Sequence, residues 1–163
     1  QLLLNSTDGS IFIYNLIKQK TTDTLKYRAQ IFDITKDDGF LIAGHSGGLI
    51  KIQKDFSFEI ISKWNGVSVF GILKKDSSFY LATQDGLIIS EPDFINYRII
   101  FKENFIYDLI DDNKGNLWLS GLSSVFRYNY KTQRESHFDA GYGQKLDEFY
   151  NNTILMNSAG AIY

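Results

Sequence analysis

A short motif returns along this chain at a nearly constant interval, and a period of this length restricts the fold to repeat architectures. The motif is a small turn residue followed by an apolar run. It begins at Gly48, Gly86 and Ser124, each 38 residues after the one before (48, 86, 124). Gly9 opens a run of the same shape 39 residues before Gly48 (9 to 48). We interpret the four runs as equivalent β-strands of successive repeat units.

Further apolar runs surround each copy of this strand in the same order. Two runs precede it and a weaker, more polar run follows it. Four short strands per unit, without a helical period, are typical of the antiparallel blades of a β-propeller. We therefore predict an all-β fold, a partial β-propeller of four-stranded antiparallel blades with about four blades' worth of chain. The predicted first, second and fourth strands are residues 31–35, 69–73 and 106–110; 2–4, 40–43, 79–82 and 117–120; and 58–62, 97–101 and 135–138.

The turns distinguish two ends of the predicted blades. Asp, Asn, Ser and Gly tolerate tight and left-handed turns, and they fill both sets of predicted connections. First and second strands are joined at residues 36–39, 75–78 and 112–115, and second and third strands at 44–47, 83–85 and 121–123. Because neighbouring strands are antiparallel, the two sets lie at opposite ends of each blade.

The repeat divides the chain into three whole units and two partial ones. The expected blades are residues 31–66, 67–104 and 105–140, with partial blades at 1–30 and 141–163. The last partial blade is expected to contain an innermost strand at 153–156. An incomplete ring exposes strand edges and apolar blade faces. We therefore expect a partner that completes it, either a second copy in a homo-oligomer or the missing remainder of the propeller.

Composition argues against several classes of function. Seventeen Lys and Arg against nineteen Asp and Glu give a net charge of −2 without a long block of either sign, so we expect no nucleic-acid partner. No apolar run approaches the roughly 20 residues of a spanning helix, and we expect no membrane contact by this segment. The chain has no Cys, and its two His lack an acidic partner at ligand spacing, so we expect no metal site and no cofactor.

Large side chains recur at fixed places in the repeat. We expect them to lie in the core between stacked blades, because packed sheets need bulky side chains between them. For the same reason we predict that Trp118 is largely buried. The aligned residues are Phe32, Phe70 and Tyr107 in the first strands, and Leu41, Tyr80 and Trp118 in the second strands.

The last whole unit carries the most specific motif. Residues 109–121 have the sequence LIDDNKGNLWLSG, followed by FRYN at 126–129 and KT at 131–132. This unit resembles the two-component-regulator propeller repeat, which has an acidic pair, a glycine turn, the letters NLW and a tyrosine strand that ends in a lysine-threonine turn. The two preceding units keep the period but have Leu41 and Tyr80 at the tryptophan position.

A second resemblance lies downstream, in residues 141–163. This region is similar to the last-blade region in the periplasmic half of hybrid two-component sensors of gut Bacteroidetes. The resemblance implies a periplasmic segment of an inner-membrane protein, with a histidine kinase, a receiver and a helix-turn-helix output on the inner side. It also implies glycan-responsive signalling. None of those other modules occurs in these 163 residues.

Two hypotheses for function follow. In the first, the chain is a ligand-sensing segment that binds an oligosaccharide in a cleft, since sugar recognition combines an aromatic platform with amide and carboxylate hydrogen bonds. In the second, it is a protein-interaction or dimerisation scaffold without a small ligand. The candidate ligand-binding residues are His45, Trp64, Asn65, Gln84, Asp85 and Asn104.

Paired carboxylates occur at residues 37–38, 111–112 and 147–148. Glycoside hydrolysis needs two carboxyl groups roughly 5–10 Å apart. Two of these pairs return at the same turn of the repeat, which favours a role in the turn over a role in catalysis. No acid, base and nucleophile converge in the pattern, so a hydrolase or lyase ranks last and we predict that this segment is not an enzyme.

Overall fold

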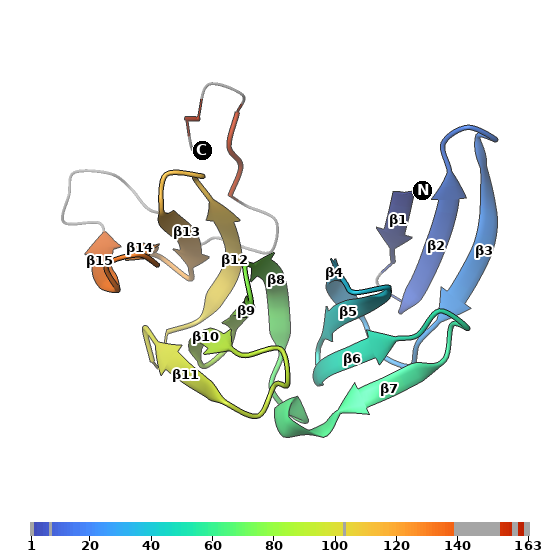
Figure 1. Cartoon of the computed structure of the whole chain (residues 1–163), viewed down its shortest axis with the longest axis horizontal. Coiled ribbons are helices and arrows are strands. Elements are labelled where there is room, and N and C mark those ends of the chain that lie inside the picture. The colour runs from blue at the N-terminus through green and yellow to red at the C-terminus, as the bar shows by residue number, and fades with distance from the viewer. Residues whose placement is uncertain (1, 7, 103, 139–153, 158–159, 162–163) are drawn as a thin grey trace.

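The chain forms four antiparallel β-sheets that fan out side by side in an open arc (Figure 1). The computed structural model describes residues 2–6, 8–102, 104–138, 154–157 and 160–161. Within them the single helix is a 3₁₀ turn, Ser62–Trp64, and no helix is long and apolar enough to cross a membrane. The strands are β1 (Leu2–Asn5), β2 (Ser10–Asn15), β3 (Lys20–Lys26), β4 (Ile31–Asp37), β5 (Phe40–His45), β6 (Gly48–Ile52), β7 (Phe58–Ile61), β8 (Val69–Lys75), β9 (Ser78–Thr83), β10 (Gly86–Ser90), β11 (Tyr97–Ile100), β12 (Ile106–Asp111), β13 (Asn116–Gly121), β14 (Val125–Asn129) and β15 (Arg134–Phe138).

Strands that follow one another in the sequence are neighbours in each sheet. The first sheet is β1–β3, the second β4–β7, the third β8–β11 and the fourth β12–β15. In the four-stranded sheets the first strand (β4, β8 or β12) lies toward the inside of the arc, and the last strand lies toward the outside (Figure 1). This is the arrangement of propeller blades, so the predicted all-β propeller is confirmed.

The strands predicted for the three whole units are all present, with ends that differ by two residues or fewer. In the first sheet, β3 was not predicted. It is polar, and Leu25 is its one buried residue, so it carries no alternation of apolar and polar residues. The blade boundaries assigned from the sequence stay a prediction.

The glycine that opens the repeated motif is required by backbone crowding. Gly48 has φ +144° and Gly86 has φ +126°, a region that residues with a side chain rarely adopt. A Cβ on Gly48 would lie 2.6 Å from the carbonyl oxygen of Trp64, and one on Gly86 would lie 2.7 Å from that of Ile100. Glycine therefore allows β6 and β10 to begin close to the backbone of the segment that follows the last strand of the same sheet.

Three apolar clusters fill the spaces between successive sheets. Neighbouring side chains of a strand point to opposite faces, so one strand contributes to two clusters. In β5, Leu41 packs toward the first sheet and Ile42 toward the third. In β9, Phe79 packs toward the second sheet and Tyr80 toward the fourth. The inner sheets are thus buried on both faces.

The sheet register corrects the predicted environment of Trp118. Its equivalents in the second strands are Ile42 and Tyr80, so the alignment with Leu41 is displaced by one residue. This position faces the following sheet, and among the described residues no sheet follows the fourth. Trp118 is therefore half-buried, stacked on Phe138 with ring centroids 5.9 Å apart. Among the described residues no blade covers its outer side, so the predicted burial between two neighbouring blades is not found there.

A carboxylate ties two neighbouring sheets together at their inner strands. Asp33 on β4 accepts a hydrogen bond from the N–H of Ile34 at 2.7 Å and one from the N–H of Ile72 on β8 at 2.7 Å. Its burial raises the pKa of Asp33, and the two backbone donors act in the opposite direction. Asp108 takes the same register position in β12 and accepts a hydrogen bond from its neighbour Leu109 at 2.8 Å.

Ion pairs join the sheets at the end where first and second strands meet, here called the hairpin end. Lys74 binds Asp37 of the second sheet, and Lys75 binds Asp111 of the fourth. Hydrogen bonds with Asp111 and Tyr130 raise the pKa of Lys75. The third sheet is thus held on both sides by charges from its own inner strand.

The described part of the C-terminal segment lies beside β12. Ile154 is buried, and its N–H donates to Oδ2 of Asp108 at 3.4 Å. Met156 forms one isolated β-bridge. Of the innermost strand predicted at 153–156, residue 153 lies outside the described residues, and the other three do not form a regular strand.

Replacing Asp33 with Ala removes the acceptor shared by the two backbone N–H groups. We expect Asp33→Ala to lower the free energy of unfolding by about 1–3 kcal/mol more than Asp23→Ala. Asp23 is the matched control, because it is exposed and its hydrogen bond with the described residues is local, from the N–H of Thr24. Urea unfolding of both variants measures the difference, and equal losses would contradict a role in joining the sheets.

The corrected register also predicts which of two alanine substitutions in β13 lowers the stability of the protein more. Leu119 is fully buried, so Leu119→Ala should cost about 2–5 kcal/mol. Trp118→Ala should cost less, although it removes more atoms, because one side of the ring faces no further sheet among the described residues. Thermal or urea unfolding checks the order. A larger loss for Trp118→Ala would mean that another part of the protein covers this ring.

Candidate functional site

Three β-bulges place an aromatic residue at the inner edge of each four-stranded sheet. The pairing of the first strand with the second skips Phe32 in β4, Phe70 in β8 and Tyr107 in β12. A bulge leaves its extra residue out of the ladder and turns its side chain in a new direction. Because the bulges share one register position, they bring the three rings together on strands that line the inside of the arc (Figure 1).

The rings form a continuous row. Phe32 and Phe70 lie 5.1 Å apart between ring centroids, and Phe70 and Tyr107 lie 5.5 Å apart. Phe105 joins them at 5.6 Å from Phe70 and 5.4 Å from Tyr107. These spacings are those of favourable aromatic pairs. We call the four residues the aromatic row. Three are half-buried, and Phe105 is 41% exposed.

The aromatic row is separate from the core. None of its members belongs to the three clusters between the sheets. The prediction that the first-strand aromatics Phe32, Phe70 and Tyr107 pack between blades is therefore wrong. Strict alternation would place them on a blade face, but each bulge interrupts the alternation at that residue. The available signal was the recurrence of an aromatic residue at one place in all three units.

The row lies next to the loop end, where second strands turn into third strands and where the connections between sheets run. The bulge in β4 follows the pairing of Ile31 with His45, which begins such a turn. Hydrogen bonds join these loops. The Oγ of Ser68 donates to the carbonyl of Ser46 at 3.0 Å, and its N–H approaches Oε1 of Gln84 at 3.4 Å.

Two of the six candidate ligand residues are buried at the loop end. His45 is 6% exposed, its Nδ1 accepts a hydrogen bond from the N–H of Gly47 at 3.0 Å, and its ring packs edge-on against Tyr27. Burial lowers the pKa of His45, with a further contribution from the charge of Arg28. His45 was predicted to lie in the turn at residues 44–47 as a candidate ligand-binding residue. It is instead the last residue of β5 and points into the protein.

Trp64 is also part of the core. It is 2% exposed, and its ring lies edge-on to Tyr97 at 4.8 Å. Its Nε1 has no hydrogen-bond partner among the described residues. Trp64 therefore does not present an aromatic face to solvent.

The other four candidates lie at the surface of the loop end. Asn65 and Asp85 are exposed, and Gln84 and Asn104 are half-buried. The amide of Asn104 donates to two carbonyls of its own loop, at 3.2 and 3.1 Å. The structure thus brings amide and carboxylate groups to the end of the sheets where the aromatic row lies. Ligand binding by the six candidates stays a prediction.

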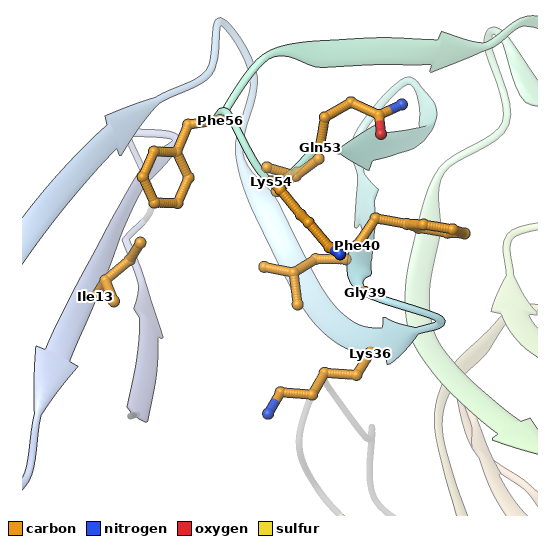
Figure 2. Close-up of a pocket in the computed structure, with 9 residues that line it drawn as sticks. Ile13, Lys36, Gly39, Phe40, Gln53, Lys54 and Phe56 are labelled. Carbon is orange, nitrogen blue, oxygen red and sulfur yellow. The ribbon is translucent and has the colours of Figure 1, made fainter.

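A pocket of about 330 Å³ opens at the hairpin end, between the first and second sheets (Figure 2). Ile13, Phe40 and Phe56 give it apolar walls, and Lys36 and Lys54 contribute the positive charge. Within the part of the chain that the structure describes, neither lysine forms an ion pair. No sequence pattern indicated this pocket, because its residues come from two repeat units.

The recurring carboxylates have structural partners. Asp112 accepts hydrogen bonds from the N–H groups of Lys114 at 2.7 Å and Asn116 at 3.0 Å, and from Nε1 of Trp118 at 3.3 Å. Burial alone raises the pKa of Asp112, but these hydrogen bonds outweigh it and hold the pKa below its usual value. Asp112 thus closes the turn, as the repeat predicts. No three His, Cys, Asp or Glu side chains gather as metal ligands among the described residues.

No protein-family model matches the sequence, and no curated protein matches it. Solved structures do match. The extracellular domain of the putative hybrid two component system BT4673 from B. thetaiotaomicron superimposes with a TM-score of 0.72 at 20% identity, over 98% of this chain and 24% of that chain. A second structure of the BT4673 extracellular domain, described as a putative one component system, gives 0.72 at 15% identity, over 98% and 23%. The β-propeller domain of Myceliophteria thermophila Cps50 (Swd1) gives 0.66 at 10% identity, over 97% and 55%.

At these identities the likeness shows the fold. The chain spans about a quarter of the length of the BT4673 domains. That this segment is not an enzyme stays a prediction, because a likeness at 15 and 20% identity shows the fold alone. The strand order, the register and the comparisons together identify the chain as a segment of a β-propeller.

Proposed function

We propose that this chain is a ligand-sensing, glycan-responsive propeller segment in the extracytoplasmic, periplasmic part of a hybrid two-component sensor histidine kinase/response regulator. The observation that carries the proposal is the aromatic row. Four rings in mutual contact, outside the core clusters and partly open to solvent, form an apolar platform on the inner edge of the arc.

The chemistry of the platform suits a sugar. The face of an aromatic ring carries partial negative charge, and the C–H groups on one face of a pyranose carry partial positive charge, so the two faces attract. A binding cleft then needs a few polar groups to fix the orientation of the ligand. Gln84, Asp85 and Asn65 supply amide and carboxylate groups at the loop end, next to the row.

The signalling context is supported by the comparisons and by the repeat motif. BT4673 carries the same fold in an extracellular domain of a putative hybrid two component system. The unit at residues 109–132 resembles the two-component-regulator propeller repeat. Such a segment would act by binding, so the absence of a convergent acid–base pair in the sequence pattern fits this role.

The second hypothesis, a protein-interaction scaffold, is favoured by a different observation. The outer face of the fourth sheet carries Trp118 stacked on Phe138, with Arg127 lying 5.7 Å from the Trp118 ring. Aromatic residues and Arg are enriched at protein interfaces. The two hypotheses use different surfaces and do not exclude one another.

Phe105→Ala should weaken glycan binding, because Phe105 is the most exposed ring of the row. The probes are malto-, cello-, xylo- and arabino-oligosaccharides, titrated into the full chain by calorimetry. Loss of one aromatic contact of about 0.5–1.5 kcal/mol corresponds to roughly twofold to twelvefold weaker binding. Phe56→Ala is the matched control, because Phe56 is 39% exposed and lies in the pocket at the hairpin end.

The outcomes of this titration test both the position of the site and the class of ligand. Weaker binding by Phe105→Ala with normal binding by Phe56→Ala supports the site. Equal binding by both variants places the sugar elsewhere and overturns the aromatic row as its platform. No binding of any probe by the native chain at millimolar concentration overturns the glycan ligand.

A further inference from the structure

A groove of about 380 Å³ runs between the second and third sheets on the outer side of the arc. Both sheets have four strands, so each wall belongs to a complete sheet. β7 is the outer strand of the second sheet, and among the described residues no strand pairs with its other side (Figure 1). We call this feature the β7 groove. It is lined by Phe40, Ile42, Lys51, Pro92, Asp93, Phe94, Ile95 and the consecutive residues 59–63.

The β7 groove follows the edge of the strand. Glu59 and Ile61 point to the face of the second sheet that meets the third sheet, and Ile60 between them points to the opposite face. A groove that contacts all three residues cannot lie on one face alone. It therefore runs along the strand edge, from the β10–β11 turn at the hairpin end to Lys63 at the loop end.

The alternation of hydrogen bonds shows which backbone groups of β7 point outward. The N–H of Gln53 donates to the carbonyl of Ser57 at 2.9 Å, so these residues form a hydrogen-bonded pair at the start of the hairpin. Pairs of this type alternate with non-hydrogen-bonded pairs along an antiparallel ladder. The pair at Glu59 is then hydrogen-bonded, and the pair at Ile60 is not. Ile60 therefore directs its N–H and C=O away from β6, toward the free edge.

The equivalent position between the third and fourth sheets is bridged by an arginine. Arg98 holds in β11 the place of Glu59 in β7. Its guanidinium donates to Oε1 of Gln133 at 2.8 Å and to the hydroxyl of Tyr128, both in the fourth sheet. Glu59 instead accepts a hydrogen bond from Gln53 of its own sheet at 2.8 Å. The edge of β7 thus lacks the bridge that joins β11 to the next sheet.

Apolar side chains surround the β7 groove. Ile42 and Phe94 are buried at its base. Ile60 is 47% exposed and Ile95 is 67% exposed, and Pro92 is also exposed beside them. Exposed apolar residues that gather at one place mark surfaces where proteins interact.

The two ends of the β7 groove carry opposite charges. Lys63 is exposed at the loop end, with its Nζ 5.3 Å from the ring centroid of Tyr97, and it forms no ion pair among the described residues. Asp93 is exposed at the hairpin end, where its carboxylate accepts a hydrogen bond from the N–H of Ile95 at 2.8 Å. A chain that lies in the groove meets a positive charge at one end and a negative charge at the other.

We propose that β7 binds an extended segment of a partner protein, which adds to its free edge as an antiparallel fifth strand of the second sheet. Strand addition gains affinity from main-chain hydrogen bonds and specificity from side-chain contacts. β7 runs from the hairpin end to the loop end, so the N-terminal part of the segment lies beside Lys63 and its C-terminal part beside Asp93. The segment accordingly has an acidic residue, then apolar residues, then a basic residue.

The proposed surface is separate from the aromatic row. The row lies on inner strands, and β7 lies on the outside of the arc (Figure 1). A partner on β7 would leave the row open to a ligand, so this proposal does not depend on glycan binding.

A displayed library of random short peptides, selected on the full chain, tests the proposal. Enriched peptides should share the order acidic, apolar, basic, and fluorescence anisotropy measures the affinity of synthetic copies. Ile60→Pro should weaken their binding at least tenfold, because Pro removes the outward N–H but no hydrogen bond to β6. Ile60→Thr keeps the N–H and the branched side chain, so it should bind nearly as well as the native chain. Circular dichroism checks that both variants fold.

Hydrogen exchange on the native chain tests strand addition without a substitution. A bound peptide should slow exchange of the Ile60 amide, which becomes hydrogen-bonded. The Glu59 amide already pairs with β6 and should change little.

The charge order is tested at the loop end. Lys63→Glu should weaken binding of the selected peptides severalfold, because their acidic residue then meets a like charge. Lys54→Glu is the matched control, since Lys54 is exposed in the β6–β7 turn and does not line the β7 groove.

The opposite results overturn the proposal. A library that yields no binder, or binders that tolerate Ile60→Pro, show that β7 accepts no added strand. Equal losses for Ile60→Pro and Ile60→Thr, or unchanged exchange at Ile60, show contact through side chains alone. Equal binding by Lys63→Glu and Lys54→Glu overturns the acidic residue of the segment.

Discussion

Burial on both faces of a sheet is the constraint on which this structure depends. Adjacent side chains in a strand point to opposite sides, and in β9 and β10 nearly all residues are buried and most are apolar. A sheet of this kind is stable only between two neighbours, because either face alone would leave a large apolar surface in water. The fan of sheets and the clusters between them follow from this one requirement.

The inner edge shows what happens where the alternation is interrupted. One extra residue in each of β4, β8 and β12 removes an aromatic side chain from the core and places it against its counterpart on the next blade. The strands themselves are fixed by the cores on both sides and by the Asp33 carboxylate that crosses to Ile72. A platform built on such strands is preorganised, so a ligand would lose less free energy to ordering the site.

The candidate site was only partly predictable, for a physical reason. Turn residues such as Gln84 and Asp85 were assigned to the loop end correctly, because antiparallel connectivity fixes which turns lie at the same end. Whether a side chain in such a turn points outward depends on the connection that packs over it. His45 and Trp64 are covered by neighbouring elements and became core residues, whereas Phe70, assigned to the core, lies on the inner edge.

The sequence by itself determined the repeat, the four-strand unit, the order of the strands and the turn chemistry, since these depend on local periodicity and on residues that tolerate positive φ. The tertiary structure alone decided which face of each strand meets which neighbour. A shift of one residue in register moves a side chain to the other face, so the equivalent of Trp118 and Tyr80 is Ile42, which packs toward the following sheet, and not Leu41, which packs toward the preceding one. Only the packed sheets show this, because a bulge or a one-residue offset leaves no trace in local composition.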